Sequence, residues 1–140
     1  MTDLRQLFDD LVGLEIALWD AVDARLRGGF ELTLGRFLAM RAVAAVPDCR
    51  VLDVAARLRI TVGAASKVVD RVEAAGHCVR RPNPGDRRSS LIALTPEGER
   101  VLAAADVVFG EELQVRLGAV LSPTALEQFS AGLGKLRSSI

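Results

Sequence analysis

The sequence predicts a mainly α-helical protein with a small β-hairpin wing, in which a winged helix-turn-helix is joined to a helical layer from both chain ends. Half of the residues are apolar, but only 4% are aromatic and Tyr is absent. A core of Leu, Val, Ala and Phe favours packed helices over a sheet sandwich. Apolar stripes with helical spacing at both chain ends, and a basic hairpin in the middle, also predict this fold. The length fits a single domain over residues 1–140.

The N-terminal segment carries the longest apolar stripe. Its members recur at steps of three and four residues, and they are Leu4, Leu7, Phe8, Leu11, Leu14, Leu18, Val22 and Leu26. This spacing predicts a long amphipathic helix that begins at Thr2-Asp3 and ends at Gly28-Gly29.

The middle of the chain has the pattern of a helix followed by a helix-turn-helix. The expected elements are a helix from Leu32 to about Val46, a loop over 47–50, a helix from Val51 to Leu58, a turn over 59–61, and a helix from Val62 to Ala75 closed by Gly76. Arg59 stands in that turn, where Gly would adopt a left-handed backbone more easily.

The last of these helices has two different faces. The expected buried face consists of Ala65, Val68, Val69 and Val72, and the opposite face of Gly63, Ala64, Ser66, Lys67, Asp70 and Arg71. Small residues, hydrogen-bonding groups and long cations suit a DNA groove. An ordinary solvated helix face is the alternative.

A basic hairpin follows this helix. Its strands are expected at about 78–82 and 91–94, around a tip at Pro82-Asn83-Pro84-Gly85, and Asp86, Arg87 and Arg88 come just after the tip. A hairpin after a helix-turn-helix predicts a winged helix, whose second helix enters a major groove while the wing touches the flanking backbone and minor groove. The expected partner is double-stranded DNA.

The charge of the chain is unevenly distributed although its formal net charge is zero. Between Arg57 and Arg88 there are eight Arg or Lys residues against three acidic ones, whereas residues 1–31 carry seven acidic residues and three basic ones. The basic footprint is therefore confined to the middle of the chain, and the ends need another role.

The C-terminal segment supplies two more amphipathic helices. One opens at Thr95-Pro96, and the other opens at Ser122-Pro123 and carries Leu126, Phe129, Leu133, Leu136 and Ile140 on one stripe. Long terminal helices without a partner would leave apolar surface exposed, which favours a dimer interface formed by 1–31 and 96–140 around a DNA-binding lobe over 32–95. An intrachain core is the alternative.

The most specific motif is Asp86-Arg87-Arg88 leading into Leu94-Thr95-Pro96-Glu97-Gly98. With the order of the helices, it resembles the MarR family of bacterial transcriptional regulators over essentially the whole chain. The resemblance implies an obligate homodimer that binds a pseudopalindromic operator and most often represses nearby genes. It also implies release from DNA by a small aromatic or anionic effector, bound between the dimer layer and the DNA-binding lobe.

The resemblance extends to single residues. Ser66, Lys67 and Arg71 match recognition-helix positions that contact DNA, with Gly63 and Ala64 on the same face. Arg88 matches the wing arginine that enters the minor groove, and Arg87 lies beside it. Asp86 matches the acid that orients the wing, and we expect it to hold an arginine by a charge-assisted hydrogen bond. A structural salt bridge without a DNA role is the alternative for Asp86 and Arg87.

The effector pocket implied by the resemblance lies where the first helix meets the winged lobe. The local residues that could stack on an aromatic ring or pair with its carboxylate are Trp19, Arg25, Phe30 and Phe37. Plain core packing is the alternative interpretation of the aromatic residues.

The two cysteines, Cys49 and Cys78, form no metal-binding or disulfide pattern and are expected to be reduced thiols. Cys78 is expected to be a small buried strand residue, and Cys49 lies in a polar loop beside Arg50, where a lowered thiol pKa would be possible. Oxidation-sensing members place their cysteine near the start of the first helix, where this chain has Leu and Phe, so redox sensing is disfavoured. His77 is expected at the surface or a strand edge.

Other classes of function find no support in the sequence. No nucleophile, His and acid constellation, phosphate loop, cofactor motif or metal site is present, so an enzyme is not expected. No signal peptide or membrane span is seen, which predicts a cytoplasmic protein. The alternative to a DNA-binding regulator is a winged-helix protein-interaction or ligand-binding module with weak or no specific DNA binding. The basic residues Arg80, Arg81, Arg87 and Arg88 in the wing favour DNA.

Overall fold

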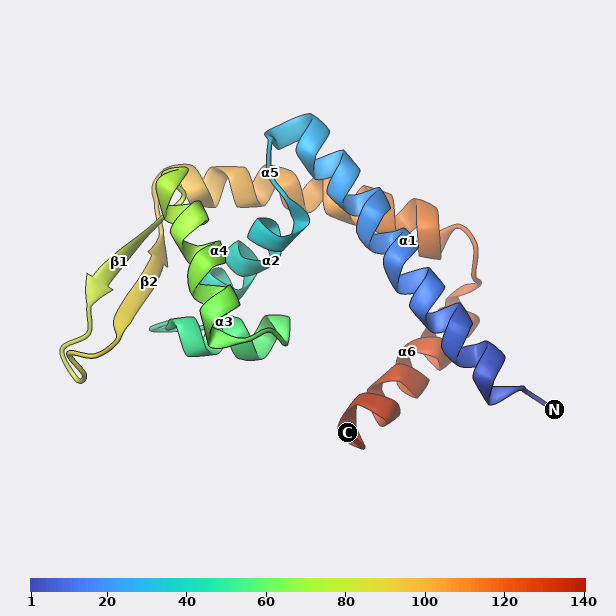
Figure 1. Cartoon of the computed structure of the whole chain (residues 1–140). Coiled ribbons are helices and arrows are strands. Elements are labelled where there is room, and N and C mark those ends of the chain that lie inside the picture. The colour runs from blue at the N-terminus through green and yellow to red at the C-terminus, as the bar shows by residue number, and fades with distance from the viewer.

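The computed structural model describes residues 1–140 as six α-helices, one π-helical turn and one antiparallel hairpin (Figure 1). The elements are α1 (Leu4–Phe30), α2 (Leu34–Ala45), α3 (Val51–Leu58), α4 (Val62–Ala74), β1 (Cys78–Pro82), β2 (Ser90–Leu94), α5 (Pro96–Leu113), η1 (Gln114–Gly118) and α6 (Pro123–Ser138). The predicted mainly helical class with a hairpin wing is confirmed. No helix has both the length and the apolar character needed to cross a bilayer.

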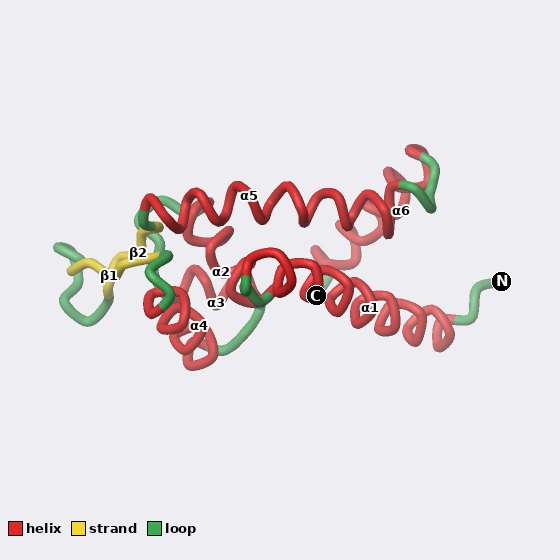
Figure 2. Tube along the Cα trace, turned by 90° about the horizontal axis from the view of Figure 1, so that it is seen from above, coloured by secondary structure: helices red, strands yellow, loops and turns green.

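The molecule is elongated, with the wing at one end and the N-terminus at the other, and the C-terminus lies between them at the bottom of the view (Figure 1). Helix α5 runs from the base of the wing toward α6, and α1 lies alongside it when seen from above (Figure 2). Helices α2, α3 and α4 pack together between the wing and α1. The elements of the predicted winged helix thus form one lobe. Helices α1 and α5 extend away from it, and α6 turns back beneath them (Figure 1).

Short polar side chains begin most of the helices. Asp3, Thr33, Thr61, Thr95 and Ser122 each accept a hydrogen bond from a backbone N–H in the first turn of the following helix. The expected end of the first helix at Gly28-Gly29 is wrong, because α1 continues to Phe30 and Glu31 takes the left-handed position at φ 52°. Phe30 packs against the core, and this burial outweighs the weak helix preference of the glycines.

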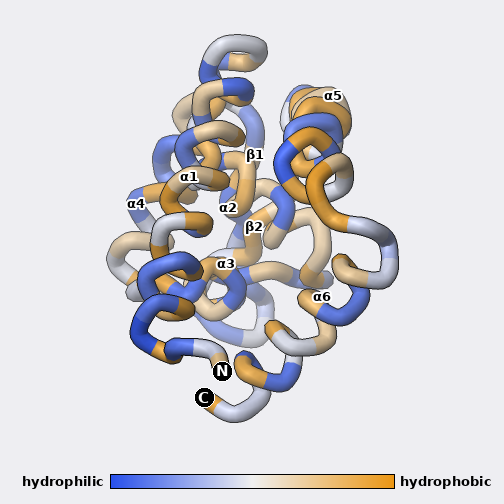
Figure 3. The backbone as a smooth tube through the Cα atoms, turned by 90° about the vertical axis from the view of Figure 1, so that its right-hand side faces the viewer, coloured by the Kyte–Doolittle hydropathy of each residue, from blue (hydrophilic) through white to orange (hydrophobic).

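The apolar core is centred on α2. Phe37 and Met40 of α2 are fully buried, together with Val54 of α3, Val69 of α4 and Leu26 of α1. The terminal helices contribute little to this core, since α1 buries only Val22 and Leu26 and α6 buries no residue. Figure 3 shows apolar positions continuing along α1, α5 and α6. The apolar stripes predicted from the sequence are therefore present on these helices, but within one chain most of their length is not covered by other elements.

Polar contacts connect α1 to the lobe and to α5. The Asp23 carboxylate accepts hydrogen bonds from the Leu34 N–H, at 2.8 Å, and from Arg27, at 2.7 Å. Farther along α1, Arg25 pairs with the buried Glu112 of α5 at 3.1 Å. Burial would raise the pKa of Asp23, but the hydrogen bonds from Leu34 and Arg27 and the positive charge of Arg27 lower it below 3.8. The junction is thus stabilised by carboxylates in their charged form.

Candidate nucleic-acid interface

Helix α4 presents the two faces that its sequence predicts. Ala65, Val69 and Val72 are buried, while Val68 is only half-buried. On the opposite face Gly63, Ala64, Lys67, Asp70 and Arg71 are exposed, with Ser66 half-buried. Lys67 and Arg71 form no ion pair with any other residue. Their positive charges, one helical turn apart, are free to meet an external anion.

The turn before α4 has an unusual backbone. Arg59 ends α3 with φ 56° and ψ 44°, the left-handed conformation that glycine adopts more easily. The turn is nevertheless closed by hydrogen bonds from the N–H groups of Arg59 and Ile60 to the carbonyl of Ala55. The arginine therefore keeps the conformation expected of this turn at a cost of about 1 kcal/mol.

The wing is an antiparallel hairpin in which Cys78 faces Leu94 and Pro82 faces Ser90. The Ile92 N–H donates to the Cys49 carbonyl at 2.7 Å, which joins the wing to the loop between α2 and α3. At the tip, the Asn83 side chain accepts from the Gly85 N–H and donates to the Ser89 hydroxyl, at 3.0 Å each. The wing is thus held at its base and across its tip.

Asp86 orients the tip in a different way from the one expected. Its carboxylate accepts a hydrogen bond from the backbone N–H of Arg88 at 2.9 Å, and it forms no ion pair with the side chain of Arg87 or Arg88. The expected carboxylate–guanidinium contact is therefore wrong, because the tight turn brings the backbone N–H to the carboxylate first. Both arginine side chains are left exposed and uncompensated.

Arg80 has a structural role that sequence reasoning missed. Its guanidinium lies 2.7 Å from the Asp70 carboxylate, 3.3 Å from the Glu73 carboxylate and 3.4 Å from the Ser66 carbonyl, all on α4. Its backbone N–H also donates to Glu73 at 2.9 Å. Arg80 thus fixes the wing to α4 and neutralises the two acids nearest the free cations. In the sequence, this contact could have been predicted from the two acidic residues that lie three positions apart on the helix before a basic strand.

A cleft of about 360 Å³ lies between the wing and the N-terminal ends of α3 and α4. Its lining includes Ser66 of α4, Arg80 of β1 and Arg88 of the wing tip, with Arg50 and Val62 beside them. The structure therefore brings together Ser66 and Arg88, which are 22 positions apart in the sequence. Lys67, Arg71 and Arg87 do not line this cleft.

Comparison with known proteins agrees with this geometry. The model of the MarR family matches residues 30–89, from the end of α1 to the wing tip. The multiple antibiotic resistance protein MarR of Salmonella typhimurium is 33% identical over 60 residues, which are 43% of this chain and 42% of that protein. The transcriptional regulator BldR of Sulfolobus solfataricus superposes over 100% of both chains with a TM-score of 0.87 and 26% identity. The chain is thus similar to the MarR family over its winged lobe.

A second solved structure shares the fold of this chain. Sco3205, a MarR family transcriptional regulator from Streptomyces coelicolor, has a TM-score of 0.89 and 20% identity over 96% of this chain and 86% of its own. The chain matches less than half of the length of the Salmonella relative, so the sequence similarity is concentrated in the winged lobe. The similarity of the terminal helices to those of other proteins is seen in the comparison with solved structures.

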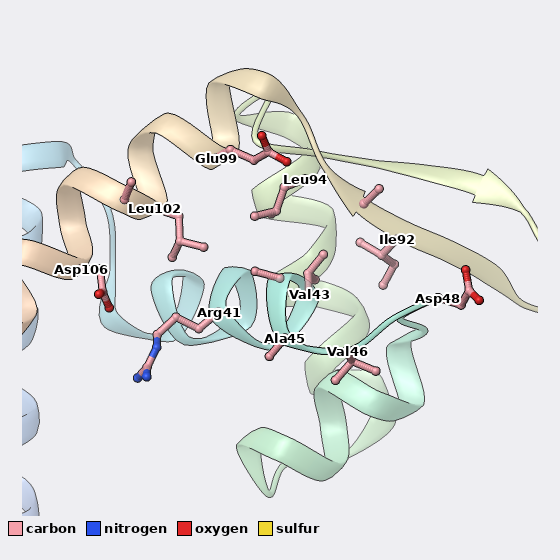
Figure 4. A pocket seen from close by; sticks show the side chains of 13 residues that line it. Arg41, Val43, Ala45, Val46, Asp48, Ile92, Leu94, Glu99, Leu102 and Asp106 are labelled. Carbon is pink, nitrogen blue, oxygen red and sulfur yellow. The ribbon is translucent and has the colours of Figure 1, made fainter.

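The structure places the four residues expected to form an effector pocket in different surroundings. Phe37 is fully buried with its ring 5.1 Å from that of Phe109, and Phe30 packs against the core. Trp19 is 44% exposed, and Arg25 is paired with Glu111 and Glu112 of α5. A cleft of about 770 Å³ lies elsewhere, between α2, β2 and α5, and none of the four residues lines it (Figure 4).

Both cysteines are buried, with 1% exposure each. The expectation of a polar setting for Cys49 is wrong. The Ile92 N–H donates to the Cys49 carbonyl, and the loop that contains Cys49 therefore packs against the wing. Burial, and then the charge of Asp53, raises the pKa of Cys49 to about 11 although Arg57 opposes the shift. Burial similarly raises the pKa of Cys78 to about 11, as expected of a packed strand residue. His77 is half-buried rather than exposed, and its Nδ1 has no hydrogen-bond partner.

Proposed function

We propose that this chain is a sequence-specific DNA-binding transcriptional regulator. In this proposal α4 enters the major groove and the wing contacts the flanking phosphates and minor groove. The observation that carries the proposal is the set of uncompensated cations Lys67, Arg71, Arg87 and Arg88 on α4 and the wing tip, while Arg80 neutralises the neighbouring acids. A surface of this kind attracts a polyanion, because each phosphate contact releases a counterion.

The similarity to Sco3205 supports this proposal, since that protein was solved in complex with DNA. A superposition over 96% of the chain implies that α4 and the wing have the spacing that such a fold presents to a duplex. Ser66, Gly63 and Ala64 would allow close approach to base edges, and Lys67 and Arg71 would bind guanines or phosphates.

The functional unit that we propose is a homodimer. Large apolar side chains are exposed along α1 and α6, including Leu4 at 75%, Phe8 at 66% and Leu136 at 55%. Exposed stripes of this length are typical of an oligomer interface. We therefore assign 1–31 and 96–140 to the dimer layer and 32–95 to the DNA-binding lobe, and two such lobes would bind a pseudopalindromic site.

Repression and control by a small ligand are part of the proposal. Its basis is the family resemblance together with the junction between the dimer layer and the lobe, where the Asp23 carboxylate accepts a hydrogen bond from the Leu34 N–H. A ligand that favours another arrangement of the lobes would change their spacing and reduce the affinity for the operator.

Selection from a random double-stranded DNA library tests the proposal against a protein-interaction role. The expected result is enrichment of a pseudopalindrome whose half-sites are about 10 base pairs apart, centre to centre. Failure of the full chain to enrich any sequence, at low and moderate salt, would contradict specific DNA binding and favour the interaction module.

A further inference from the structure

Two exposed apolar side chains line the cleft between the wing and the N-terminal ends of α3 and α4, which we call the wing cleft. Leu52 of α3 is 55% exposed and Val62 of α4 is 48% exposed. Apolar side chains elsewhere on the same helices, such as Val54 and Val69, are fully buried in the core. Leu52 and Val62 thus lie outside this core and keep much of their apolar surface in contact with water, which is unfavourable until a partner covers it.

The starts of the two helices hold these side chains in place. Val62 is the first residue of α4, and the Thr61 hydroxyl caps this helix by accepting a backbone N–H at 3.1 Å. Leu52 is the second residue of α3, where the Asp53 carboxylate accepts from the Arg50 N–H at 2.8 Å. Capped helix ends are fixed before a partner arrives, so the apolar pair is preorganised for binding.

The neighbours of this pair belong to the proposed DNA interface. Ser66, one helical turn after Val62, lines the wing cleft from α4, and Arg88 lines it from the wing tip. Arg88 forms no ion pair within the chain. A DNA strand that passes from the major groove at α4 to the minor groove at the wing would cross this cleft. The apolar pair would therefore face the edge of the major groove.

The major groove offers one apolar partner to such a pair. Its base edges carry hydrogen-bond donors and acceptors, and the C5-methyl group of thymine is the apolar group among them. Contact with Leu52 and Val62 would remove this methyl group from water together with the two side chains. Cytosine has no methyl group at the same position and gains nothing from the contact.

We propose that Leu52 and Val62 recognise the C5-methyl group of a thymine at one position of each half-site. This inference rests on the proposed DNA-binding function and assigns to it a determinant of sequence that is independent of charge. Lys67 and Arg71 lie farther along α4 and outside the wing cleft, so they would contact other positions.

Deoxyuridine tests the methyl contact directly, because uracil has the hydrogen-bonding groups of thymine and lacks only the methyl group. In a duplex enriched from the random library, each thymidine is replaced in turn at the equivalent position of both half-sites, and the affinity of the full chain is measured. At the recognised position the replacement should weaken binding by about threefold per half-site and about tenfold for the two together, as expected of one buried methyl group each. Unchanged affinity at every position would overturn the proposal.

Alanine variants show whether the apolar pair makes this contact. The readout is the ratio of affinities for thymidine and deoxyuridine DNA, from which a general loss of affinity cancels. Leu52→Ala/Val62→Ala should bring this ratio close to one, and the fold should persist because both side chains are exposed and alanine favours helices.

Ile60→Ala is the matched control. Ile60 is an apolar residue in the turn between the same two helices, 37% exposed, and it does not line the wing cleft. Its variant should keep the ratio of wild type. A wild-type ratio in Leu52→Ala/Val62→Ala, or an equal loss in the control, would place the methyl contact elsewhere and overturn the proposal.

The failure of this inference differs from the failure of the proposed function. Specific binding of the thymidine duplex without any discrimination against deoxyuridine would overturn the methyl contact and leave the DNA-binding function intact. Absence of specific binding to any duplex would contradict the proposed function and this inference with it. Selection repeated with Leu52→Ala/Val62→Ala should lose the thymine at the recognised position and retain the rest of the half-site, and retention of that thymine would also overturn the proposal.

Discussion

At the scale of single residues, the Leu-Thr-Pro-Glu-Gly motif has a clear structural reason. The Thr95 hydroxyl donates to the Gly76 carbonyl at 2.6 Å and accepts from the Gly98 N–H at 3.0 Å, while the Thr95 N–H donates to the His77 carbonyl. Gly98 lies so close to His77 that a Cβ atom would overlap its carbonyl group. The motif thus fastens the start of α5 to the base of the wing.

Replacement of Gly98 by Ala should therefore destabilise the protein by about 2–3 kcal/mol, because backbone must move to admit the methyl group. Gly35→Ala is the control, since no atom lies within 4 Å of the corresponding Cβ position and the helix gains up to about 1 kcal/mol. Urea unfolding at one protein concentration measures both. A Gly98→Ala variant as stable as wild type would show that the contact is not a constraint.

Arg80 should couple energetically to the acids of α4. In a double-mutant cycle of Arg80→Met with Asp70→Asn, we expect a coupling energy of about 0.5–1 kcal/mol in unfolding free energy, the range of a partly exposed pair. Arg81→Met with Asp70→Asn is the control, because Arg81 forms no ion pair. Additive effects of Arg80 and Asp70 would mean that the wing is not fixed through this contact.

At the scale of elements, local signals were sufficient to predict most of the fold. Val51–Leu58 and the start of α5 were predicted correctly because capping residues and apolar spacing act within one or two turns. The contacts of Arg80 and the burial of Cys49 depend on residues distant in sequence, and no local pattern specifies them. For the same reason, the sequence predicted the exposed cations of α4 but placed Asp70 among the free groups.

The contacts of α1 with the winged lobe and with α5 should make stability depend on pH. The hydrogen bond from Arg116 lowers the pKa of Glu112 below 4.5 and outweighs the effect of burial, and the charges of Arg116 and Arg25 act in the same direction. The pKa of Asp23 is likewise lowered, below 3.8. Carboxylates with lowered folded-state pKa values stabilise the fold above their unfolded values, and this contribution is lost as pH falls through the folded values.

Unfolding free energy should therefore be flat between neutral pH and about pH 5 and should fall below about pH 4. Asp23→Asn removes one of these carboxylates, so its stability should decline less steeply with acid than that of wild type. Chemical unfolding from pH 3 to pH 7 at fixed protein concentration measures the slope. Identical slopes for the two proteins would show that the Asp23 contacts do not stabilise the junction.

At the scale of the whole molecule, we expect a dimer that does not dissociate without unfolding. Leu133→Asp would place a charge in the layer formed by α1, α5 and α6, at a cost of several kcal/mol to the assembled state. Ile60→Asp is a matched control, since both residues are 37% exposed in the single chain but Ile60 lies in the turn before α4. Light scattering at micromolar concentration should show a dimer for wild type and the control. A stably folded wild-type monomer would contradict the proposed layer.

We propose that α4 and the wing tip bind DNA through uncompensated cations. The most direct test of this binding is the affinity of wild type, Arg71→Ala and Arg88→Ala for operator and scrambled DNA across salt concentrations, with Arg100→Ala on α5 as control. Loss of Arg88 from two subunits should weaken binding broadly and make the dependence of log K on log salt shallower by about two units. Loss of Arg71 should cost about 1–3 kcal/mol per half-site and relax specificity there. An Arg88→Ala variant with the affinity and salt slope of wild type would contradict the claim.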